Sequence, residues 1–200
     1  DLDENIKNTY AHPEKAGARG YKPFGKETAV GETTPDLKEF WHHGPQVDES
    51  FDSRIASNIN VKEVQAFNDQ CDLLFNQLNN LGIEVLRAIA LILELDSKFF
   101  DDWALKGNSI LRLIHYPPVS NSSNTLRARA HGDINLITLL VGAEESGLEV
   151  LSPDGDWIPI VAKSKSIVCN IGDMMELVTR SQLKSTTHRV VDNNTKTSKS

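Results

Sequence analysis

Residues 131–141 read HGDINLITLLV, and this stretch is the strongest structural signal in the chain. From Ile134 to Val141 the residues are mostly apolar and β-branched, which predicts a strand. Side chains at positions i and i+2 of a strand point to the same side. We therefore expect His131 and Asp133 to share one face at the start of this strand. A second predicted strand, over residues 185–191, brings His188 toward them from far along the chain.

Two histidines and one carboxylate can occupy one face of an octahedral metal ion and leave the opposite face open. Such a ligand set is diagnostic of non-haem Fe(II) oxygenases. We therefore interpret His131, Asp133 and His188 as candidate metal ligands. A His-x-Asp pair occurs by chance in many chains, so the motif does not establish a metal site by itself.

The region from Leu111 to Val191 resembles the Fe(II)/2-oxoglutarate dioxygenases of the isopenicillin N synthase-like family. The matching runs follow the order of the family and comprise residues 112–118, 130–133 leading into 137–140, 147–150, 154–159, 170–173 and 183–190. Upstream, Gly20-Tyr21 and residues 35–40 also resemble the family. The resemblance covers most of the chain, and it is strongest in the second half.

This resemblance implies an oxygenase that hydroxylates or desaturates a small molecule while 2-oxoglutarate is converted to succinate and CO2. Fe(II) would be held by His131, Asp133 and His188, and 2-oxoglutarate and O2 would take the open face. Tyr116 matches a tyrosine that contacts the cosubstrate in relatives, although packing beside the Pro-Pro pair that follows it is an equal alternative. Ile114 stands where plant members often have asparagine, which removes one hydrogen-bond donor.

One motif of the family is missing from the sequence. The family binds the distal carboxylate of 2-oxoglutarate with an Arg-x-Ser pair shortly after the last histidine ligand, because a guanidinium group fits a carboxylate bidentately. No such pair follows His188 before the sequence stops at Ser200. We expect the pair beyond Ser200 and the family's N-terminal section before Asp1, and we interpret the sequence as part of a longer protein.

Arg127 and Arg129 precede His131 at a spacing of two. If the strand begins as early as Arg127, both guanidinium groups share the metal face and bind an anionic substrate, with Arg129 as the closer contact. The alternative, which the sequence favours, is that residues 120–128 form a polar loop and that both arginines are solvated. Gly132 contributes no side chain, so a roomy metal site is expected.

Two other functions stay open on the sequence alone. An Fe(II) oxidase of the isopenicillin N synthase type has the same fold and uses O2 without 2-oxoglutarate. A non-catalytic jelly-roll binding module would carry the triad without turnover or with structural zinc. Structural zinc sites are closed four-ligand sites, however, which argues against the zinc reading of a three-ligand set.

The second half of the chain has the pattern of short strands separated by turns. From Asn108 onward this pattern indicates an antiparallel double-stranded β-helix, or jelly roll. Asp154-Gly155 predicts a hairpin turn, and Asn170 and Gly172 are expected to form a structural corner.

The first half contains one long amphipathic segment. Apolar residues recur at intervals of three and four, which predicts a helix that begins at Val61 behind an Asn60 cap. The stripe consists of Val64, Phe67, Cys71, Leu74, Leu78, Leu81, Val85, Ile89 and Ile92. We expect it to pack against a sheet, with a dimer seam as the alternative, and a short helix follows at residues 97–104.

The predicted fold class is therefore mainly β with helical support, a jelly roll backed by a long α-helix. Residues 1–107 are interpreted as the N-terminal helical and irregular part of the domain. Residues 108–200 are interpreted as the oxygenase core, which is incomplete at its C-terminus.

The composition limits the class of protein and its partners. With 39% hydrophobic and 24% charged residues, the chain is typical of a soluble globular protein, and no apolar run is long enough to cross a bilayer. The net charge of −7 argues against a nucleic-acid partner. A small-molecule substrate is the expected partner, and the oligomeric state is open.

The cysteines and one pair of histidines are interpreted as structural rather than functional residues. Two cysteines and no signal peptide favour the cytoplasm, and both Cys71 and Cys169 are expected in the core. The adjacent histidines His42 and His43 lie in a region rich in glycine and proline, and they are expected to be solvated loop residues.

Overall fold

The computed structural model describes residues 2–15, 17–28, 35–117, 126–142, 147–161, 163 and 165–191. Its contacts divide the chain into two compact units. The first, here the helical unit, comprises Asp1–Pro23 and Phe40–Leu113. The second, here the strand unit, comprises Phe24–Glu39 and Ile114–Ser200. The expected division of one domain into residues 1–107 and 108–200 stays a prediction.

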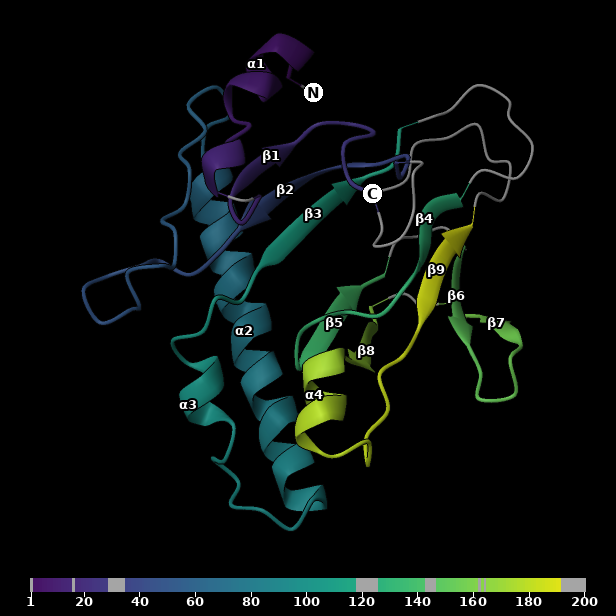
Figure 1. Cartoon of the computed structure of the whole chain (residues 1–200). Helices are drawn as coiled ribbons and strands as arrows, with labels where there is room; N and C mark the ends of the chain where they lie inside the picture. The colour runs from purple at the N-terminus through teal and green to yellow at the C-terminus, as the bar shows by residue number, and fades with distance from the viewer. Residues whose placement is uncertain are drawn as a thin grey trace. The chain divides into compact units, whose positions relative to one another are not determined.

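The helical unit contains a small sheet and a long helix (Figure 1). Its elements are α1 (Glu4–Thr9), the 3-10 turn η1 (Pro13–Lys15), β1 (Gly20–Lys22), β2 (Glu39–His43), α2 (Phe67–Ile92), α3 (Asp101–Ala104) and β3 (Leu111–His115). The first residue of β2 and the last two residues of β3 are assigned to the strand unit. The three strands are hydrogen-bonded in the order β1-β2-β3.

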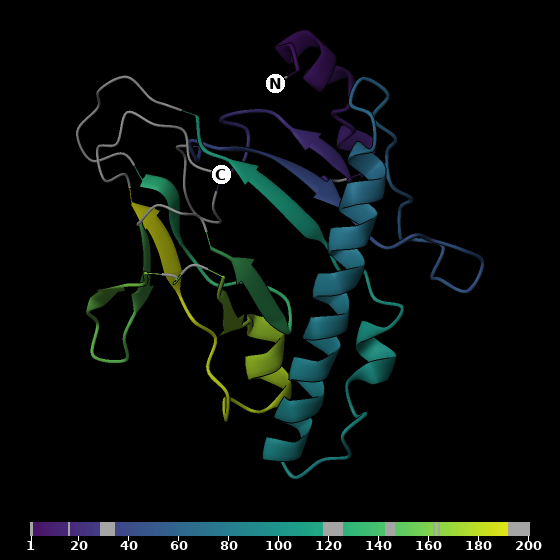
Figure 2. The same ribbon diagram turned by 180° about the vertical axis from the view of Figure 1, so that it is seen from behind.

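The long helix α2 packs against this sheet, as the sequence predicts, and Figure 2 shows the two side by side from behind. The Trp41 ring of β2 meets the edge of Phe67, with centroids 5.4 Å apart. Tyr21, Trp41 and Val61 form a buried cluster, and Phe67 at the N-terminal end of the helix packs against it. Aromatic burial in the central strand therefore fixes where the helix docks.

The predicted start of the long helix is wrong. The helix α2 begins at Phe67, after Ala66 in a left-handed conformation with φ of 60° and no side-chain cap. The amide of Asn68 donates to the Ile59 carbonyl at 2.8 Å, and its oxygen accepts from the Val61 N–H at 2.9 Å. The second bond engages the backbone of Val61, where the helix was expected to begin.

The buried face of α2 also departs from the predicted stripe. The buried residues are Cys71, Phe75, Ile83, Leu86 and Ala90. Two members of the predicted stripe, Leu81 and Ile92, are 40% and 73% exposed. The predicted stripe repeats about every 3.5 residues, whereas a straight helix turns every 3.6, so such a stripe drifts around the helix by about 20° per heptad. The periodicity predicted the helix correctly but gave the wrong buried face.

In its described residues, the strand unit holds two antiparallel sheets and one short helix (Figure 1). Its elements are β4 (Leu126–His131), β5 (Ile137–Val141), β6 (Leu148–Leu151), β7 (Trp157–Pro159), β8 (Ile167–Ile171), α4 (Asp173–Val178) and β9 (His188–Val191). The larger sheet has the order β4-β9-β6-β7, and the smaller sheet pairs β5 with β8. Among the described residues these sheets do not close into a barrel.

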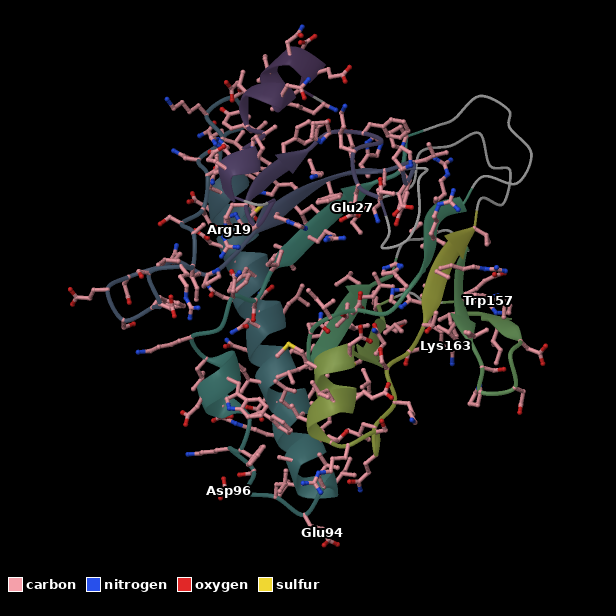
Figure 3. The ribbon with its side chains drawn as sticks, viewed as in Figure 1. Arg19, Glu27, Glu94, Asp96, Trp157 and Lys163 are labelled. Atoms are coloured by element: carbon pink, nitrogen blue, oxygen red, sulfur yellow. The ribbon has the colours of Figure 1, made fainter. Side chains whose placement is uncertain are left out.

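The predicted hairpin at Asp154-Gly155 is confirmed, since Leu151 of β6 pairs with Trp157 of β7. Gly155 has a φ of +91°, a conformation that favours glycine. Trp157, labelled in Figure 3, lies under the Arg189 guanidinium at 4.0 Å from the ring centroid. Arg189 also donates to Glu149 at 2.7 Å. These contacts assign Trp157 and Arg189 to packing on the larger sheet.

Two structural readings of single residues are wrong. His42 and His43 are 6% and 1% exposed and belong to β2, because the aromatic pair that precedes them occupies the central strand of the sheet. Cys169 is exposed. On β8 the neighbouring Asn170 side chain bonds inward to Asp133, so strand alternation turns Cys169 outward.

Cys71 is buried, as expected, and both cysteines are free. No helix in the described part of the chain combines the length and apolar character that crossing a bilayer requires.

Candidate metal centre

The first two candidate ligands come from the end of one strand and the connection that follows it. His131 is the last residue of β4, and Asp133 lies between β4 and β5. The prediction that both share one strand is therefore wrong. The connection is held instead by the start of α4, where Asp173 N–H donates to the Asp133 carbonyl at 2.7 Å and Gly172 N–H to the Leu136 carbonyl at 3.0 Å.

Antiparallel pairing brings in the third candidate ligand. His188 opens β9 and is the register partner of His131, and the two rings have centroids 4.5 Å apart. Oδ1 of Asp133 lies 4.0 Å from Nε2 of His131 and 3.9 Å from Nε2 of His188. Within the described ranges, this is the one cluster of histidine, cysteine and carboxylate side chains able to hold a metal ion, with donor atoms within 4.8 Å of one another.

Each histidine has its second ring nitrogen hydrogen-bonded to a backbone carbonyl two residues earlier. Nδ1 of His131 lies 2.7 Å from the Arg129 oxygen, and Nδ1 of His188 lies 2.9 Å from the Thr186 oxygen. A carbonyl only accepts, so these bonds assign the proton to Nδ1 in both rings. The lone pairs of both Nε2 atoms are then available at the cluster, as metal ligation requires.

The carboxylate of Asp133 is oriented by two side chains from the smaller sheet. Its Oδ2 accepts from Thr138 Oγ1 at 2.6 Å and from Asn170 Nδ2 at 2.9 Å. Burial raises the pKa of Asp133, but these bonds and the two nearby histidine rings outweigh it, and the pKa lies below its ordinary value. Asp133 is therefore an ionised ligand whose Oδ1 is directed at the histidines.

The donor set fits Fe(II) in chemistry. Two imidazole nitrogens and one carboxylate oxygen form the facial set of non-haem iron oxygenases. At bond lengths of about 2.1 Å, donors on one face of an octahedral ion lie about 3 Å apart. The Nε2–Oδ1 separations of 3.9 and 4.0 Å are wider, so binding draws these atoms together by about 1 Å.

The expectation of a roomy site around Gly132 is wrong on the side where its side chain would lie. A Cβ at this position would lie 2.7 Å from Asp173 Oδ1 and 3.1 Å from Ser185 Oγ. A side chain at this position would therefore require Asp173 or Ser185 to shift.

The region of the predicted substrate arginines is strand rather than loop at residues 126–131, and residues 118–125 lie outside the described residues. Arg127 is fully buried and donates to the Pro117 carbonyl, which overturns the solvated reading for this residue. Arg129 is half-buried, and its N–H donates to Asp36 at 3.3 Å. Register shifts along β4 interrupt strict alternation, so the spacing of two does not by itself align both arginines with His131.

Sequence reasoning missed Thr138 and the true role of Asn170. Thr138 was read only as a strand residue, and Asn170 was expected to be structural. The signal for Asn170 was its place in the 170–173 run, immediately before the α4 corner. Tyr116 is half-buried directly after β3, and its contact with the cosubstrate stays a prediction.

Comparison with known proteins gives consistent similarities. A model of the 2OG-Fe(II) oxygenase superfamily matches residues 107–200. A 2-oxoglutarate-dependent dioxygenase of Didymella fabae is 30% identical over 96% of this chain, and a proline hydroxylase of Petromyces alliaceus is 31% identical over 92%. The chain spans 63% and 60% of the lengths of these two relatives.

Solved structures show the same likeness. A 2OG-Fe(II) oxygenase family protein from Caulobacter crescentus is 49% identical with a TM-score of 0.86, covering 96% of this chain and 63% of that one. A full-length Neurospora crassa protein, solved in complex with alpha-KG (2-oxoglutarate) and thymine, is 28% identical with a TM-score of 0.83, covering 100% of this chain and 66% of that one. These similarities confirm the predicted jelly-roll fold class.

Proposed function

We propose that the chain is a member of the 2OG-Fe(II) oxygenase superfamily, whose model matches residues 107–200, and that the protein is an Fe(II)- and 2-oxoglutarate-dependent dioxygenase of a small molecule. The proposed iron ligands are His131, Asp133 and His188. The observation that carries the proposal is the convergence of their three donor atoms within 4.8 Å. Membership of the isopenicillin N synthase-like branch stays a prediction.

The protein's own residues orient the three proposed metal ligands. The carbonyls of Arg129 and Thr186 fix the ring tautomers, and Thr138 and Asn170 turn the Asp133 carboxylate toward the histidines. When bound, Fe(II) with 2-oxoglutarate and O2 supplies the oxidising chemistry and yields succinate and CO2. These bonds set the tautomers and the carboxylate orientation before the metal binds, so binding requires only the approach of about 1 Å between the donor atoms.

The proposed cosubstrate contact is Tyr116, and the proposed substrate is an anionic small molecule. The Neurospora crassa relative binds the small molecule thymine together with alpha-KG, which supports a small-molecule substrate here. The anionic character rests on Arg129, which is half-buried two residues before His131. If Arg129→Ala leaves substrate affinity unchanged while iron still binds, the anionic proposal fails.

Turnover assays separate this function from its competitors. We expect succinate formation that requires Fe(II), 2-oxoglutarate and O2 together, and that stops in His131→Ala. Oxygen consumption that needs no 2-oxoglutarate would favour the oxidase. Metal-independent ligand binding without turnover would favour the non-catalytic module. The cytoplasmic location stays a prediction, in keeping with two free thiols.

A further inference from the structure

The segment that leads into His188 is held by two carboxylates of α4. Ser185 Oγ donates to Asp173 Oδ1 at 2.5 Å. The backbone N–H of the same serine donates to Glu176 Oε2 at 2.7 Å. Residues at positions i and i+3 lie on one face of a helix. A single helix face therefore binds Ser185 through both its side chain and its backbone.

The next residue along the chain orients the His188 ring. Thr186 N–H donates to the Ile171 carbonyl at 3.2 Å, and the Thr186 carbonyl accepts from Nδ1 of His188 at 2.9 Å. On the other side, Leu151 N–H donates to the Thr187 carbonyl at 2.9 Å. The carbonyl that sets the His188 tautomer thus belongs to a segment fixed from two directions, and Ser185 is its first residue.

Asp173 also contacts the segment that carries the other two candidate ligands. Its N–H donates to the Asp133 carbonyl at 2.7 Å. Its Oδ1 occupies the space beside Gly132, where a Cβ would lie 2.7 Å away. Asp173 is therefore a point at which the two ligand-bearing segments are tied together.

Glu176 gathers further donors around the same segment. Its Oε1 accepts from Ser181 Oγ at 3.1 Å and from Lys184 Nζ at 3.4 Å. The Ser185 N–H is the main cause that lowers the pKa of Glu176 below its ordinary value, so the carboxylate is ionised. Hydrogen bonds to an ionised acceptor are roughly twice as strong as neutral ones.

We infer that Asp173 and Glu176 are positioning residues that act through Ser185 to direct Nε2 of His188 toward the metal. Neither carboxylate belongs to the donor cluster. The inference rests on the proposed Fe(II) site and adds to it the residues that preset its geometry. The effect expected is on metal affinity and ligand field, since residues that orient metal ligands typically change affinity by about 10- to 100-fold.

The test compares four variants with the wild-type protein, using Co(II) as an air-stable probe of the site. Asp173→Asn and Glu176→Gln weaken the acceptors, Ser185→Ala removes the hydroxyl, and Ser185→Thr keeps it. Ser166→Ala is the matched control, because it removes a serine hydroxyl that donates to the Lys163 carbonyl at a turn of the same unit. Co(II) affinity, the visible ligand-field spectrum and the thermal midpoint of the metal-free protein are measured for each.

We expect about tenfold weaker Co(II) binding and a shifted spectrum in Asp173→Asn, Glu176→Gln and Ser185→Ala. Ser185→Thr and the control should bind Co(II) like the wild type. Wild-type affinity and spectrum in all three weakened variants would overturn the inference, even if their thermal midpoints fall, because the residues would then serve stability alone. If the wild type itself binds neither Co(II) nor Fe(II), the proposed metal site fails, which is a distinguishable result.

Discussion

Two pairs of histidines in this chain differ in how closeness in sequence relates to a shared site. His42 and His43 are adjacent, yet their rings are bound by different protein groups: His42 by the Gly17 carbonyl and Arg112, and His43 by Asp72. His131 and His188 are far apart in sequence, yet they are register partners on neighbouring strands.

The pairs differ in whether Nε2 of each ring is hydrogen-bonded to another protein group. Nε2 of His42 accepts from Arg112 at 2.7 Å, and Nε2 of His43 lies 2.6 Å from Asp72. In the second pair the protein bonds Nδ1, and both Nε2 atoms face the Asp133 carboxylate. A candidate metal ligand is thus recognised by the nitrogen that converges with other donors, and the density of histidines in sequence is a poor guide.

Removing one histidine from each pair gives the largest expected contrast. His188→Ala should abolish stoichiometric Fe(II) binding and reduce turnover by about 1000-fold or more, because a required metal ligand is lost. His43→Ala should keep one Fe(II) per chain. Metal content after anaerobic loading and gel filtration measures both. Equal iron loss in the two variants would break the distinction between the pairs.

The stability of the same variants should show the reverse order. His43 is 1% exposed and bonded to Asp72, so His43→Ala should lower the free energy of unfolding by about 2–3 kcal/mol. His188→Ala should cost less in the metal-free protein, because its Nε2 faces a site built for a metal. Urea denaturation of both apoproteins measures the difference. A more stable His43→Ala than His188→Ala would contradict the structural role of the first pair.

The support of the Asp133 ligand gives a smaller effect. Asn170→Ala removes one of two side-chain bonds to Oδ2 and should weaken Fe(II) binding by about tenfold. Asn80→Ala, at an exposed position of α2, serves as the control. Isothermal titration with Fe(II) under argon distinguishes them. If the Asn170→Ala protein binds iron like the control, the Thr138 hydroxyl alone is enough to orient the Asp133 carboxylate.

The smallest effect expected is a pH dependence that both units share. The pKa of Asp101 is lowered mainly by its hydrogen bonds from Arg87, and the pKa of Glu176 mainly by the Ser185 N–H. A carboxylate with a lowered folded pKa stabilises the protein above its unfolded pKa of about 4, and this contribution is lost as the pH falls through the folded pKa.

Asp101→Asn and Glu176→Gln should therefore lower the thermal midpoint of the apoprotein at pH 7. Their deficits should shrink as the pH falls below about 4, because the wild-type carboxylates are then protonated as well. Thermal scans between pH 7 and pH 3 measure the deficits. Deficits that stay constant over this range would assign the loss to shape rather than charge.

The parts of the fold that follow from local patterns were predictable. The hairpin at Asp154-Gly155 needed only a turn signal between apolar strands. The long helix needed only its periodicity. The exact face of that helix was not predictable, because a small error in the assumed repeat rotates the stripe over 26 residues.

The parts of the site that depend on tertiary contacts were beyond the sequence. The His-x-Asp spacing pointed to His131 and Asp133, but their arrangement comes from the α4 corner rather than from one strand. The burial of His42 and His43 depends on a central strand that glycine and proline signals concealed. The role of Asn170 required knowing that the smaller sheet faces Asp133.

An anaerobic titration of the protein with Fe(II) and then 2-oxoglutarate tests the central claim most directly. We predict one Fe(II) per chain and a weak visible charge-transfer band that develops only when both are present. The band should be absent in His188→Ala and retained in His43→Ala. No iron binding by the wild-type protein, or an undiminished band in His188→Ala, would contradict the assignment of His131, Asp133 and His188 as the iron site.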